Sequence, residues 1–90
     1  MIDFKPALNR VWVDNSEVVL TALELRLLRL LWLNRGSLIF YTEIIDVVWE
    51  EKDYELDDYK VLLIMLVKRL RKKIGVDVIQ NRRGIGYGIL

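Results

Sequence analysis

The side chains best suited to chemistry in this sequence are basic, and they gather toward its C-terminal end. Five lie within residues 68–73 and two more stand side by side in the tail: Lys68, Arg69, Arg71, Lys72, Lys73, Arg82 and Arg83. Lysine and arginine attract phosphate and carboxylate oxygens, so this clustering favours a polyanion as partner. A solvated helix face would carry similar charges, and charge alone does not separate the two interpretations.

The composition excludes most catalytic and metal-binding chemistry. The 90 residues include no cysteine and no histidine, which removes thiolate ligands, the commonest zinc ligand and the usual general base. The longest apolar run, Val61–Val67, is far shorter than the roughly 20 residues that span a bilayer. We expect one small intracellular binding domain, not an enzyme, with no cofactor, metal, small-molecule ligand or membrane contact.

The net charge of +1 hides an asymmetry along the chain. Residues 1–57 carry six lysines and arginines against eleven acidic residues, whereas residues 58–90 carry eight against two. An asymmetry of this kind indicates that the polyanion would meet the C-terminal third of the chain.

Two helices are expected before the basic segment. Thr21 and Glu24 have the spacing of a capping box, and leucines recur behind them at helical spacing, which predicts a helix over about 22–34. Thr42 is expected to cap a short second helix that ends near Trp49.

The basic residues lie on a third predicted helix, over about 58–74. Gly75 would end this helix. The apolar residues of the helix recur at helical spacing and predict one buried stripe: Leu63, Val67, Leu70 and Ile74. Val61 and Met65 should point outward, with Leu66 at the edge of the stripe. The helix is therefore apolar all round at its start and strongly basic at its end.

Extended segments flank the helices on both sides. Residues 2–20 alternate weakly around a polar turn cluster, which predicts a hairpin or meander. Residues 78–89 read as a second hairpin with its tip near 82–84, where Gly84 would supply a positive φ. No helix follows the spaced glycines of this tail, so they are not expected to form a phosphate-binding loop.

Strands, three helices with a basic third one and a terminal hairpin make an α+β winged helix-turn-helix. In this order of elements the sequence resembles the OmpR/PhoB-type effector domain of bacterial two-component response regulators, over nearly the whole chain. Four segments carry the resemblance, in order: 20–28 (LTALELRLL), 47–49 (VVW), 69–74 (RLRKKI) and 83–87 (RGIGY). It implies a single domain with an N-terminal antiparallel sheet over 1–20, helices over 22–74 and a wing over 76–90.

The resemblance implies sequence-directed binding of double-stranded DNA by a transcriptional regulator, with the third helix in the major groove and the wing in the adjacent minor groove. Lys68, Arg69 and Arg71 fall on basic sites of the recognition helix, and Arg83 on the wing arginine, with Arg82 beside it. Phosphates suit the lysines and a base edge suits an arginine. We therefore expect Lys68, Lys72 and Lys73 to contact phosphates and Arg69 to contact a base. Val61 and Met65 are expected to contact thymine methyl groups.

The acidic segment before the third helix falls on the loop that in this family can touch RNA polymerase. Its candidate contact residues are Glu50, Glu51, Asp53 and Glu55. A homodimer on DNA and a cytoplasmic, nucleoid-associated location follow from the same resemblance. The 90 residues contain no phosphoacceptor receiver domain, so the chain is either an excised fragment or a domain that acts alone.

Two departures from the family pattern leave alternatives open. Phe40-Tyr41 replaces the customary Ser-Arg start of the second helix, which removes a phosphate contact. Leu62, Ile64 and Leu66 stand where the family usually has polar residues. This apolar start of the third helix could meet DNA methyl groups, a second copy of the domain or the acidic loop; the alternative function is a winged helix that binds a protein through this face.

Overall fold

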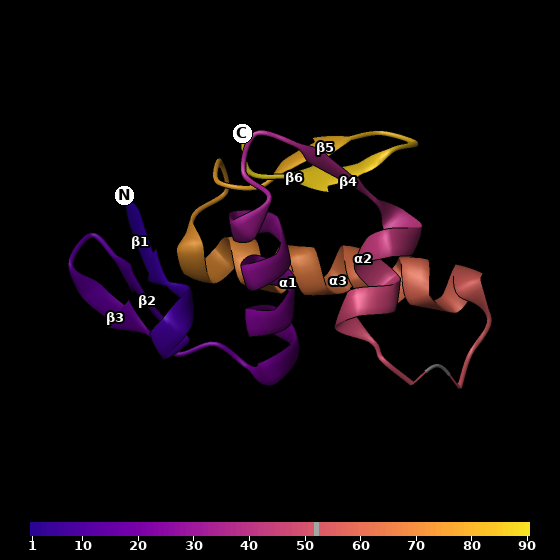
Figure 1. Ribbon diagram of the computed structural model, residues 1–90, viewed down its shortest axis with the longest axis horizontal. Helices are drawn as coiled ribbons and strands as arrows, with labels where there is room; N and C mark the ends of the chain where they lie inside the picture. Colours follow the sequence, from indigo (N-terminus) through magenta and orange to yellow (C-terminus); the bar gives the residue numbers. More distant parts are fainter. Residues whose placement is uncertain (52) are drawn as a thin grey trace.

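The computed structural model describes residues 1–51 and 53–90 of the chain; Lys52, inside the acidic loop, lies outside the described residues. Two three-stranded sheets flank a three-helix core (Figure 1). In chain order the elements are β1 (Ile2–Lys5), the short helix η1 (Pro6–Leu8), β2 (Arg10–Val13), β3 (Ser16–Val18), α1 (Ala22–Leu33), β4 (Leu38–Phe40), α2 (Tyr41–Val48), α3 (Leu56–Ile74), β5 (Gln80–Arg82) and β6 (Gly86–Gly88). None of the helices within this described part is long and apolar enough to cross a membrane.

The N-terminal sheet is the predicted meander. Its strands are antiparallel in the order β1-β2-β3, with Phe4 opposite Val11 and Val11 opposite Val18. Phe4 and Val11 are buried, because alternate residues of each strand face the helices. Asp14 and Asn15 take positive φ between β2 and β3, which suits the short polar side chains of the predicted turn.

The first helix begins as its sequence predicts, and the second does not. At α1, Thr21 accepts a hydrogen bond from the backbone of Glu24, and the Glu24 carboxylate accepts one from the backbone of Thr21. At α2 the predicted cap is wrong, because Thr42 lies inside the helix and Phe40 occupies the cap position without a side-chain hydrogen bond.

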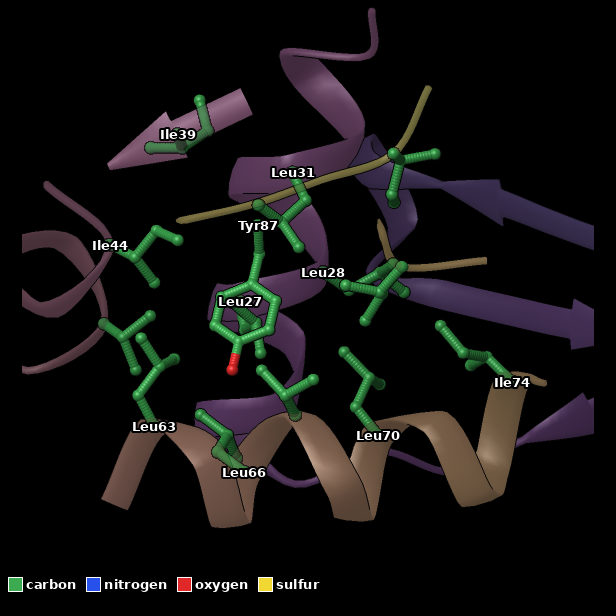
Figure 2. Close-up of a cluster of buried hydrophobic side chains, with 14 of the residues drawn as sticks. Leu27, Leu28, Leu31, Ile39, Ile44, Leu63, Leu66, Leu70, Ile74 and Tyr87 are labelled. Carbon is green, nitrogen blue, oxygen red and sulfur yellow. The ribbon is translucent and has the colours of Figure 1, made fainter. Parts of the chain in front are cut away.

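The core forms where α1 crosses α3, and the ring of Tyr87 lies among its side chains (Figure 2). The predicted stripe of α3 is confirmed, with all four residues at most 2% exposed: Leu63, Val67, Leu70 and Ile74. The expectation that Leu66 sits at the edge is wrong, because its side chain is 3% exposed and joins the same core. The helix starts two residues earlier than predicted, at Leu56.

The C-terminal hairpin is a wing attached to a strand that the sequence did not predict. β4 pairs with β6, and β6 with β5, so the sheet order is β4-β6-β5. Gly86 lies so close to β4 that a Cβ there would stand 1.7 Å from the carbonyl oxygen of Ile39. Two residues earlier, in the turn between β5 and β6, Gly84 has a φ of 78°, as its predicted turn position requires. Pairing with β4 therefore fixes β6, and the turn at Gly84 shapes the tip.

Candidate nucleic-acid interface

A groove of about 700 Å³ separates α3 from the wing. One wall is α3, and the other is the β5–β6 hairpin together with Tyr41 at the start of α2. The α3 wall carries a row of residues spaced four apart, which places them on one side of the helix: Lys60, Ile64, Lys68 and Lys72. Arg83 and Asn81 face them from the hairpin, and Tyr87 lines the floor.

Five of the predicted site residues have exposed cationic groups that are available to bind an anion. They form no ion pair or side-chain hydrogen bond within the part of the chain that the structure describes: Lys68, Arg69, Lys72, Arg82 and Arg83. Lys68, Lys72 and Arg83 lie on opposite walls of the groove, so residues far apart in the sequence supply charge to one surface. An exposed, unpaired cation keeps its full attraction for a phosphate.

Arg71, predicted as a recognition-helix contact, lines the groove and also makes a hydrogen bond within the fold. Its Nη2 donates a hydrogen bond of 2.7 Å to the carbonyl oxygen of Ile79, and its Nε is buried with no acceptor among the described residues. The guanidinium group thus ties the end of α3 to the segment that leads into the wing. Contact between Arg71 and DNA stays a prediction.

Lys73 was also expected to contact phosphate, and its ammonium group forms an ion pair within the fold. Its Nζ lies 2.7 Å from Oε1 of Glu24, a residue only 1% exposed, and 3.4 Å from the carbonyl oxygen of Val19. Burial alone would raise the pKa of the Glu24 carboxyl, but hydrogen bonds from Lys73 and Thr21 outweigh it and hold the pKa below its ordinary value. Lys73 therefore joins α3 to α1.

Tyr41 lines the groove, a position that the sequence analysis did not predict. Its hydroxyl lies 3.2 Å from Oδ1 of Asn81 and 3.4 Å from the carbonyl oxygen of Arg82, and its backbone N–H donates to Ile85. Its ring meets Tyr87 edge to face at 5.5 Å. Tyr41 thus connects the start of α2 to both strands of the wing, and no local sequence signal reveals those distant partners.

The ring of Tyr87 lies between the wing and the helices, with its hydroxyl directed toward α3 (Figure 2). Burial raises the pKa of this hydroxyl, the nearby Tyr41 raises it further, and Arg71 opposes the rise. Tyr87 consequently remains a neutral packing group at physiological pH. Lys60 is a second missed residue, although its four-residue spacing from Ile64 could have indicated it.

The apolar start of α3 is partly uncovered. Val61 and Met65 are 58% and 44% exposed, as expected for outward-pointing residues. Ile64 is also exposed, at 59%, whereas Leu62 is half-buried. The possibility that the acidic loop folds over this whole face is thereby contradicted. The loop packs elsewhere, with rings of Trp49 and Tyr54 against Tyr59.

The acidic loop presents its carboxylates to solvent. Four candidate contact residues are exposed: Glu50, Glu51, Asp53 and Glu55. The backbone N–H of Asp53 donates a hydrogen bond of 2.8 Å to the hydroxyl of Tyr59, which is buried at the first turns of α3. This bond gives the described part of the loop a fixed point beside the helix.

Comparisons with known proteins show which family this chain is similar to. Residues 15–89 match the family described as "Transcriptional regulatory protein, C terminal". The regulatory protein VanRB of Enterococcus faecalis is 32% identical over 78 residues, covering 87% of this chain and 34% of VanRB, so the chain spans about a third of that relative's length.

Solved structures share the fold. The DNA-binding domain of Bacillus subtilis CssR superposes with a TM-score of 0.82 at 26% identity, with 100% of both chains covered. The DNA-binding domain of the response regulator AdeR, solved in complex with an intercistronic region, superposes with a TM-score of 0.75 at 18% identity, covering 98% of this chain and 90% of that one. The chain therefore belongs to the OmpR/PhoB-type family of winged-helix, DNA-binding effector domains of transcriptional response regulators.

Proposed function

We propose that this chain binds double-stranded DNA as a transcriptional regulator, with α3 in the major groove and the tip of the wing in the adjacent minor groove. The observation that supports it most directly is a set of exposed cations on both walls of the groove that form no ion pair with any residue the structure describes: Lys68 and Lys72 from α3 and Arg83 from the hairpin. A helix and a wing charged in this way can follow two neighbouring grooves of one duplex.

Roles within this surface follow from side-chain chemistry. Lys68 and Lys72 neutralise phosphates and release counterions, which gives affinity without sequence preference. Arg69 can pair with a guanine edge through two hydrogen bonds, and Arg82 and Arg83 suit a narrow minor groove. Val61 and Met65 are exposed beside them and can contact thymine methyl groups.

Salt dependence on a random duplex tests the proposal. Affinity should fall steeply with salt, and Lys72→Gln should lower the slope of log affinity against log salt by about 0.9. Lys5→Gln is the matched control, since Lys5 is exposed on the N-terminal sheet, away from the groove. Equal slopes for the two variants would place DNA elsewhere, and no binding at low salt would refute the function.

A double variant tests the wing separately. Arg82→Ala with Arg83→Ala should weaken binding on every duplex and flatten the salt slope further, because both cations sit at or beside the exposed turn. If the double variant binds as tightly as the parent, the hairpin is not a DNA element.

A second candidate, binding of a protein through the start of α3, is favoured by the exposure of Val61, Ile64 and Met65. Met65→Lys separates the two. With DNA contact, it raises non-specific affinity through its added charge and blurs the preference for thymine-rich sites; with a protein interface, it abolishes self-association or partner binding and leaves DNA preference unchanged.

The remaining parts of the proposal concern partners beyond DNA. RNA polymerase is the partner proposed for the exposed carboxylates of the acidic loop, and a second copy of the domain is proposed on an adjacent DNA site. A DNA-bound regulator of this kind would act in the cytoplasm at the nucleoid. Charge reversal at Glu50 and Glu51 that leaves DNA affinity intact but abolishes transcriptional activation would support the polymerase contact.

A further inference from the structure

The side of α3 that faces away from the core is exposed along most of its length. Its buried side chains point toward α1 and Tyr87, as Leu63, Leu66 and Leu70 do in Figure 2. On the opposite side, residues at three- and four-residue spacing form one continuous surface, which we call the outer face. Each of its residues is exposed: Asp57, Asp58, Val61, Ile64, Met65, Lys68, Arg69 and Lys72.

The outer face changes its chemistry from one end of the helix to the other. Its first two residues are acidic, the next three are apolar and the last three are basic. The apolar ones are at least 44% exposed, and the basic ones form no ion pair with any residue that the structure describes. Asp57 lies 3.9 Å from Lys60 of its own helix, yet 94% of its side chain is exposed. An uncovered apolar patch therefore lies between opposite charges.

This order of charges is complementary to itself when the helix is reversed. A two-fold axis at the level of Leu63 places Asp57 opposite the partner's Arg69 and Asp58 opposite the partner's Lys68, and it brings the two apolar patches together. Such a contact uses the same surface on both copies, and burial of the exposed apolar side chains favours it. DNA matches only the basic end of the outer face, whereas a second, antiparallel copy matches all three parts.

We propose that two copies of the domain pair through the outer faces of α3 in antiparallel orientation, and that this pair excludes DNA. Two helices bury less surface than the roughly 1,600 Å² of a standard interface, so we expect a weak, reversible dimer with a dissociation constant of about 10–500 µM. The pairing does not depend on the proposed function. The exclusion rests on it, because the proposed function assigns to DNA residues that the pair would cover: Val61, Met65, Lys68, Arg69 and Lys72.

Sedimentation equilibrium of the free domain tests the pairing. The average mass should rise from that of a monomer toward that of a dimer between about 10 µM and 1 mM. Added salt should weaken the dimer, because its charge pairs lie at the exposed ends of the contact. A monomer at about 1 mM would overturn the proposal, and so would growth beyond a dimer, because a two-fold contact closes on itself.

Two charge-reversed variants identify the surface. Asp57→Lys with Asp58→Lys makes both ends of the outer face basic, and Lys68→Glu with Arg69→Glu makes both ends acidic. Each variant alone should dimerise at least about tenfold more weakly than the parent, because unlike pairs become like pairs. An equimolar mixture should form a heterodimer, in which every pair is again unlike. Absence of that heterodimer would overturn the antiparallel assignment.

A control separates local pairing from net charge. Asp3→Lys with Asp77→Lys changes the net charge as much as the basic α3 variant does, at two exposed positions outside α3. This control should dimerise like the parent. Equal weakening by the control and the α3 variant would show that the outer face is not the contact.

A second pair of variants tests the apolar patch without changing charge. Met65→Gln should weaken the dimer at least about threefold, since each dimer loses two apolar contacts. Leu33→Gln is the control, because Leu33 is 62% exposed and lies on α1. Both positions are exposed, so both variants should fold. Equal dissociation constants for the two variants would remove the apolar patch from the contact.

Energy transfer between labelled copies separates this inference from the proposed function. Lys5→Cys gives one dye position on the N-terminal sheet of a chain that has no other cysteine. A duplex of about 12 base pairs, too short for two half-sites one turn apart, should abolish the transfer when in molar excess. Transfer that persists in duplex-bound domain would refute the exclusion. A domain that pairs but binds no duplex would refute the proposed function and leave the pairing standing.

Discussion

The basic residues at the end of α3 are of the same kinds and are used differently. On the exposed side, Lys68 and Lys72 line the groove and form no ion pair among the described residues. Arg71 lines the same groove but donates a hydrogen bond to the carbonyl of Ile79. On another side of the helix, the fastening side, Lys73 pairs with the buried Glu24. The contact that each side chain makes, and not its residue type, therefore separates the cations that can meet a polyanion from those that stabilise the fold.

The largest expected effect lies on the fastening side. Lys73→Met should lower the free energy of unfolding by about 1.5–3 kcal/mol, because it leaves the Glu24 carboxylate buried without its charged donor. Urea denaturation measures this, and the salt slope of DNA binding should not change. Lys72→Met is the matched variant, with stability within about 0.5 kcal/mol of the parent and a flatter salt slope. Similar stabilities for both variants would contradict the claim that Lys73 stabilises the fold and Lys72 does not.

The next-largest effect should distinguish a base contact, proposed for Arg69, from a phosphate contact, proposed for Lys68. Arg69→Ala should cost about 1–3 kcal/mol on a site selected from random DNA and much less on random duplex, because a base contact is lost. Lys68→Ala should weaken both duplexes alike. Anisotropy titrations on the two duplexes measure the ratio, and an equal loss from Arg69→Ala on each would remove its proposed reading role.

A smaller effect should follow from loosening the wing. Tyr41→Phe removes a hydroxyl that reaches Asn81 and the carbonyl of Arg82, and keeps the ring contact with Tyr87. Stability should fall by about 0.5–1.5 kcal/mol. Amide exchange should quicken in β5 more than in α1, because the bond is local to the wing. Uniform quickening would mean that Tyr41 supports the whole core.

The smallest expected change is in the acid dependence of stability. The pKa of Glu24 is lowered in the folded state, so its stabilising contribution is present above the ordinary value of 4.5 and is lost as pH falls through the folded-state pKa. The stability gap between the parent and Glu24→Gln should therefore narrow below pH 4.5. Denaturation midpoints between pH 3 and 7 measure it, and a constant gap would show that Lys73 does not favour the ionised form.

Local patterns predicted the helices better than the contacts between them. The capping box of Thr21 and Glu24 and the buried stripe of α3 depend on residues within one or a few turns, and both are confirmed. β4 has three residues, too few for a recognisable alternation, and its partner β6 lies far along the chain. A similar distance hid the role of Lys73, whose partner Glu24 lies on α1, and the role of Arg71 depends on the backbone carbonyl of Ile79, which side-chain types do not reveal.

The close approach of β6 to β4 has a consequence for how this domain can change over generations. At Gly86 and Gly88 a Cβ would stand 1.7 Å and 2.5 Å from the carbonyl oxygens of Ile39 and Ser37, so no other residue fits without moving backbone. Arg82 and Arg83 meet no such barrier, because both are exposed. The wing thus combines glycines that the fold requires with exposed positions that can change, and new binding preferences can arise at those positions without disturbing the pairing of β6 with β4.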